Sequence, residues 1–74
     1  MADMINYLLT QQTDTAVIAF GGVMAPDDER AIAETAKVVK DRVHDLEPSH
    51  IITVARPDGA SVLSATVAEW VKMR

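Results

Sequence analysis

The chain has 74 residues, with eleven acidic and seven basic side chains, a formal net charge of −4 and no cysteine. We expect one domain over residues 1–74, because a chain of this length has no room for a second core. The absence of cysteine excludes disulfides and thiolate zinc sites, which leaves packing and assembly as the sources of stability.

The hydrophobic content is high for so small a domain, at 49% of the residues. A small folded domain exposes a large share of its surface, so a monomer of this size has difficulty hiding that many apolar side chains. Large exposed apolar patches usually mark interfaces. We therefore expect a homodimer or a surface that binds another protein.

The charge pattern argues against a nucleic-acid partner, and the lengths of the apolar runs argue against a membrane. Acids outnumber bases, and the densest group of bases is the scattered set Lys37, Lys40 and Arg42, whereas nucleic-acid binding needs a basic face. No apolar run approaches the roughly 20 residues that span a membrane, and the first residues lack the basic start of a signal peptide. A cytoplasmic protein is the simplest interpretation.

Two strands joined by a hairpin are predicted near the start of the chain. Residues 4–10 place Ile5, Tyr7 and Leu9 at alternate positions, which is the period of a strand. A polar four-residue segment then leads to residues 15–20, an unbroken apolar run typical of a strand covered on both faces. The Gly-Gly pair that follows is expected to end this second strand.

A long helix is predicted from residue 26 or 27 to about residue 46. Acids at positions 27–29 favour the positive end of the helix dipole, and the proline at position 48 stops the helix. The same acids would repel a phosphate bound after the Gly-Gly pair. Apolar residues recur at intervals of three and four positions and form one stripe: Ile32, Ala36, Val39, Val43 and Leu46.

One group of side chains on this helix has the spacing of metal ligands, but no metal site is predicted. Asp41, His44 and Asp45 have the spacing that places them on one side of a helix, where they could hold a divalent cation. Exposed Asp and His side chains are common on solvated helix faces, so the prediction is no metal and no cofactor.

Residues 50–56 are rich in β-branched side chains and predict a third strand, parallel to the second because a helix connects them. The Pro-Asp-Gly turn at residues 57–59 has two possible continuations. A helix from near Asp58 is preferred, because Leu63, Val67, Trp70 and Val71 would form an apolar stripe. The alternative is a second hairpin with a short fourth strand at residues 60–63. In both cases the last ten residues are expected to be helical.

The predicted fold class is α+β. We expect a small two-layer domain of order β-β-α-β-α, in which a three-stranded mixed sheet packs on two helices, with the fourth strand at 60–63 as an open possibility.

The function predicted from the sequence is a small non-enzymatic protein-interaction module that forms a homodimer and docks on another protein. No nucleophile, base and orienting group can be assembled, so no enzyme is predicted. The first strand is expected to lie at an open sheet edge that could pair with its copy. The predicted contact residues are Met4, Tyr7, Trp70, Val71 and Met73; an ordinary core position is the alternative for Trp70.

A second hypothesis is a small-anion-binding or phospho-regulated domain. It uses Arg56, Asp58 and Ser61, which flank the turn at the carboxyl end of the third strand. Under the helical continuation, free N–H groups at the helix start would meet the anion beside Arg56. The alternative role for Asp58 or Ser61 is simply to cap that helix.

Overall fold

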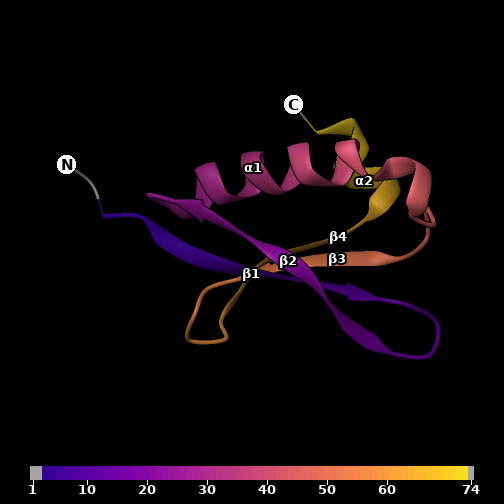
Figure 1. The fold of residues 1–74 in the computed structure, drawn as a ribbon, viewed down its shortest axis with the longest axis horizontal. Helices are drawn as coiled ribbons and strands as arrows, with labels where there is room; N and C mark the ends of the chain where they lie inside the picture. Colours follow the sequence, from indigo (N-terminus) through magenta and orange to yellow (C-terminus); the bar gives the residue numbers. More distant parts are fainter. Residues whose placement is uncertain (1–2, 74) are drawn as a thin grey trace.

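The computed structural model describes residues 3–73, which form a four-stranded antiparallel sheet with two helices on one of its faces (Figure 1). The elements in chain order are β1 (Ile5–Gln12), β2 (Val17–Ala25), α1 (Asp28–Asp41), a 3-10 turn (Val43–Asp45), β3 (Ile51–Ala55), β4 (Ser61–Thr66) and α2 (Val67–Lys72). This is the expected α+β class with one more strand than predicted.

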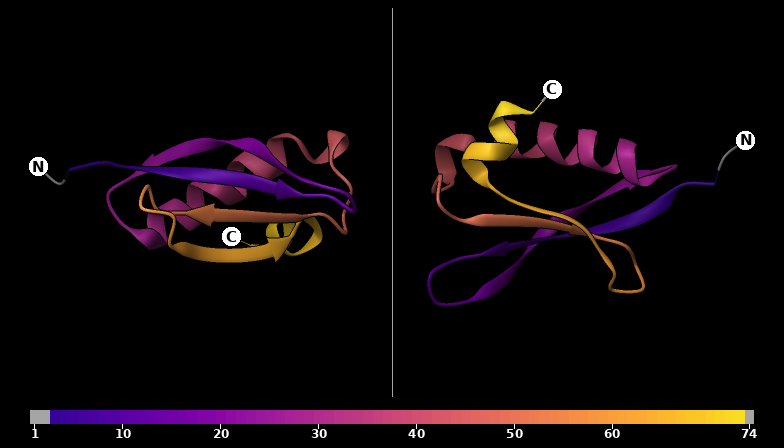
Figure 2. Two further views of the ribbon diagram at one scale, coloured as in Figure 1. Left: turned by 90° about the horizontal axis from the view of Figure 1, so that it is seen from below. Right: turned by 180° about the vertical axis from the view of Figure 1, so that it is seen from behind.

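The sheet order is β2-β1-β3-β4, and every neighbouring pair is antiparallel. β2 and β3 run in the same direction, as the connecting helix implied, but β1 lies between them and pairs with both. The predicted mixed sheet and the predicted edge position of the first strand are therefore wrong. The edges are β2 and β4 (Figure 2, left).

The turn at residues 57–59 closes a hairpin, so the preferred helix from Asp58 is wrong. The N–H of Arg56 donates to the carbonyl of Ala60 at 2.8 Å, and the Asp58 carboxylate accepts from the N–H of Ala60 at 2.9 Å. Gly59 has a φ of +95°, a conformation that side chains with a Cβ rarely adopt. The last helix is accordingly short, six residues opened by a capping box between Thr66 and Glu69.

β2 is longer and more exposed than the sequence indicated. It continues through the glycine pair to Ala25, and because it is an edge strand, the residues of its first half are mostly exposed rather than covered on both faces. The register slips by one residue at Phe20, which has no partner on β1. Gly21 follows this bulge with a φ of +154°, so the glycines allow the strand to bend instead of ending it.

α1 begins where the sequence predicted and ends earlier. The Asp27 side chain caps it by accepting from the N–H of Arg30 at 2.9 Å. The α-helix stops at Asp41, and the segment up to Asp45 continues as a 3-10 turn. The buried side of α1 consists of Ala31, Thr35, Ala36 and Val39. These small residues let the helix lie close to the sheet.

The core lies between the helices and the sheet. Tyr7 and Leu9 of β1, which alternate along the predicted first strand, both point into it. Trp70 is the largest buried side chain, and its indole N–H donates to the carbonyl of Ile52 at 2.9 Å. The other buried apolar residues are Val23, Ala25, Ala31, Ala36, Val39, Ile52, Val54, Ala65 and Val67. None of the helices within residues 3–73 has the length and apolar character needed to cross a membrane.

Candidate interaction surface

The sheet face opposite the helices is uncovered and carries no charge (Figure 2, left). We call it the open face; it consists of four β1 residues, Asn6, Leu8, Thr10 and Gln12, the residues opposite them on β2 and β3, and Ser61, Ser64 and Thr66 of β4. Charged residues are absent from all four strands as the structure describes them. Antiparallel sheets with one solvated face normally carry polar residues on that face; here the polar residues are all neutral, and apolar ones stand among them.

Apolar side chains stand out on this face. Leu8 is 49% exposed, Met24 58% and Val17 65%. Leu8 lies on the inner strand β1, with Gly22 opposite it on β2 and Ala55, the last residue of β3, opposite it on the other side. Because Gly22 and Ala55 are small, the Leu8 side chain projects above the residues on either side of it.

The polar groups of the open face are neutral, and some of them satisfy one another. The hydroxyls of Thr53 on β3 and Ser64 on β4 lie 2.8 Å apart and form a hydrogen bond. Thr10 lies opposite Thr53 on the other side. The free-energy cost of dehydration is smaller for neutral groups that already have hydrogen-bond partners than for charges. Covering this face with a partner therefore costs little free energy.

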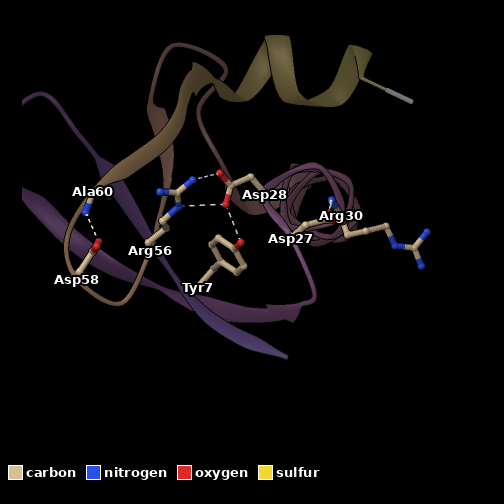
Figure 3. A network of polar contacts seen from close by, with 7 residues as sticks. All are labelled: Tyr7, Asp27, Asp28, Arg30, Arg56, Asp58 and Ala60. Atoms are coloured by element: carbon tan, nitrogen blue, oxygen red, sulfur yellow. Dashed lines mark hydrogen bonds and ion pairs between the residues drawn. The ribbon is translucent and has the colours of Figure 1, made fainter. Parts of the chain in front are cut away.

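A separate polar cluster joins β1, α1 and β3 (Figure 3). The Tyr7 hydroxyl donates to Oδ1 of Asp28 at 2.7 Å, and Nε of Arg56 donates to the same oxygen at 3.2 Å. Nη2 of Arg56 pairs with the other carboxylate oxygen of Asp28. Burial and the bond to Asp28 raise the pKa of Tyr7, while the bonds from Arg56 and then Tyr7 lower the pKa of Asp28.

The cluster borders an open depression between β1 and the start of α1, which Pro26, Asp27 and Glu29 also line. Asp28 already neutralises the Arg56 guanidinium, and the nearby carboxylates would repel an anion. Among the described residues that line the depression, none therefore offers a free positive group to a phosphate.

The predicted anion site is not brought together. Asp58 turns its carboxylate to the N–H of Ala60, as Figure 3 shows, and Ser61 is the exposed first residue of β4. The helix start that was to supply N–H groups lies at Val67, at the far end of β4. Of the three residues, Arg56 alone takes part in the polar cluster.

The predicted contact residues fall in different places. Tyr7 and Trp70 are fully buried in the core, so neither side chain is available on the surface of the monomer. Met73 is half-buried against the core, and Val71 is exposed on α2, in the helical layer. Met4, exposed just before β1, alternates in step with Asn6 and Leu8 and extends the open face.

The predicted contact residues do not include Leu8, Val17 and Met24, which the structure leaves exposed on the open face. The absence of charge from these strands is visible in the sequence, but which of their residues are exposed is not. As for metal ligands, no three His, Asp or Glu side chains within residues 3–73 lie close enough to hold an ion.

Comparison of the chain with protein-family models, with curated proteins and with solved structures finds no match.

Proposed function

We propose that this protein is a small non-enzymatic protein-interaction module that binds through the open face of its sheet. The observation that carries the proposal is the complete absence of charge from the four strands, whose outer face is left uncovered by the helices. A cytoplasmic location is part of the same proposal and rests on composition alone.

The chemistry of the open face supports protein binding. The centres of protein interfaces are depleted of charged residues and enriched in large apolar ones such as Met. The open face presents Leu8, Val17 and Met24 among small and neutral polar residues. The charges of the chain lie instead in the helices, the loops and the ends.

The alternative, a small-anion or phospho-regulated site at residues 56–61, has weaker support. It requires a free guanidinium, and Arg56 is held by Asp28 through two hydrogen bonds. It would gain support only if an anion competed with Asp28 for Arg56.

Site-specific photo-crosslinking tests the proposal. When Leu8 is replaced by a photoreactive amino acid, irradiation of cells that express the protein should give discrete crosslinked protein products. The matched control is Lys37 on α1, whose side chain is 73% exposed on the helical layer. Equal crosslinking from both positions, or none from Leu8, would contradict binding through the open face.

A further inference from the structure

The geometry points to a second copy of this chain as the occupant of the open face, in a two-fold symmetric stack of the two sheets. This inference rests on the proposed function, because it names the partner for the same surface. The resulting dimer has four layers, with the sheets inside and the helices outside.

Charge favours this arrangement over contact through the helical layers. The chain carries a net charge of −4, and the start of α1 concentrates Asp27, Asp28 and Glu29 on the helical side. Contact through the helical layers would bring like charges together. Stacked sheets lie about 10 Å apart, so a face-to-face dimer buries only uncharged strand residues and keeps the two acidic layers on opposite outer sides.

The shape of the open face also favours a face-to-face dimer. In a two-fold dimer the same patch meets itself, so the patch must contain both a projection and a place to receive it. Leu8 is the projection, and Gly22 and Ala55 on either side of it leave room for the Leu8 of the other copy. A Cβ at Gly22 would lie 3.0 Å from the carbonyl oxygen of Tyr7, so this position is kept free of a side chain.

The size of the face indicates the strength of the dimer. Four strands about 4.8 Å apart and about six residues long cover an area of roughly 20 by 20 Å. Two such faces together bury roughly 800 Å², which is below the total of about 1,200 Å² at which stable specific interfaces begin. We therefore expect a dimer that dissociates on dilution.

The edge of β2 is a less suitable site for self-association. The bulge at Phe20 interrupts the regular edge, and Nη1 of Arg42 donates to the Phe20 carbonyl at 3.3 Å. The Arg42 guanidinium also lies 5.2 Å from the centre of the Phe20 ring. A strand added along this edge would have to displace Arg42, whereas the open face needs no rearrangement.

Light scattering across a hundredfold range of concentration tests the inference with charge variants. The native chain should approach twice its mass of 8.0 kDa at high concentration. Leu8→Glu and Leu8→Lys should each remain at the mass of one chain, because like charges would meet near the two-fold axis. A mixture of the two variants should recover a heterodimer, which a folding defect would not do, and Lys37→Glu should dimerise like the native chain.

A single introduced cysteine provides an independent readout, because the chain has none of its own. Thr10→Cys, near the middle of the face, should form a disulfide-linked dimer under mild oxidation, and Lys37→Cys should not. A native chain that stays monomeric, or a dimer that persists in Leu8→Glu, would overturn the inference. If the native chain is monomeric and Leu8 crosslinks to a different protein, the inference fails while the proposed function stands. If Leu8 crosslinks to nothing, the proposed function fails too.

Discussion

The hydroxyl of Tyr7, on the inner strand β1, donates a 2.7 Å hydrogen bond to the carboxylate of Asp28, the first residue of α1. Tyr7 is fully buried, so its hydroxyl needs a partner within the protein. The partner is partly exposed and is held in turn by Arg56 at the end of β3. The cluster thus ties the start of the long helix to two strands, which indicates a structural role.

Removing the Tyr7 hydroxyl should weaken the fold. We expect Tyr7→Phe to lower the midpoint of thermal unfolding by about 4 °C, the size of shift that one lost hydrogen bond causes in a small domain. The same change in an Asp28→Ala background should have a smaller effect, because the acceptor is already absent. Circular dichroism melts of the four proteins measure this, and equal shifts in both backgrounds would contradict the role of the bond.

The cluster should make stability depend on pH at both extremes. The pKa of Asp28 is lowered from its usual 3.8, so its stabilising effect is fully present above pH 3.8 and is lost as pH falls further. The pKa of Tyr7 is raised from its usual 10.0, so its contribution is present below pH 10.0 and declines as pH rises through the raised value. Urea midpoints should therefore fall at both ends of the pH range.

Two single-residue controls separate these effects. Asp28→Asn should flatten the acid limb, and Tyr7→Phe the alkaline limb. Tyr7 is the single tyrosine of the chain, so its ionisation can be followed directly by ultraviolet absorption. A Tyr7 that ionises at or below pH 10.0 in the folded protein would be inconsistent with the burial and hydrogen bond observed.

Sequence patterns predicted the features of the fold that depend on residues close together in the chain. The alternation around Tyr7 predicted a strand there, although not that its Tyr7 side is buried, and the acids at positions 27–29 marked the start of α1 correctly. The strand order could not be predicted, because it depends on which long-range partners β1 takes. The spacing of Leu63, Val67 and Trp70 suits one helix, yet Leu63 lies on β4 and pairs with Val54, while Val67 begins α2.

The candidate surface was only partly predictable for the same reason. The same apolar run, residues 15–20, is compatible with a central strand and with an edge strand. The sequence therefore did not predict that these residues would be exposed in β2. Tyr7, Asp28 and Arg56 are 21 and 28 residues apart along the chain, and no spacing rule joins them. The uncharged strands were visible in the sequence, but assigning their faces required the register.

The indole of Trp70 should be essential to the core. Trp70→Ala removes the largest buried side chain and is expected to cost about 3–5 kcal/mol, a large part of the stability of a domain this small. Trp70→Phe keeps much of the volume but leaves the Ile52 carbonyl without its donor, so a smaller loss is expected. Urea unfolding followed by circular dichroism measures both; a Trp70→Ala protein as stable as the native chain would show that α2 does not anchor the core.

The hairpin between β3 and β4 should depend on the conformation of Gly59. Its φ of +95° is unfavourable for a residue with a Cβ, so Gly59→Ala should destabilise the domain by about 1–2 kcal/mol. A Cβ there would touch nothing within 4 Å, so the cost comes from the backbone and not from a clash. Gly59→Asn is the matched control and should lose less, because asparagine tolerates positive φ better than alanine does. Equal losses, measured by urea unfolding, would mean that added bulk rather than backbone conformation determines the stability of the turn.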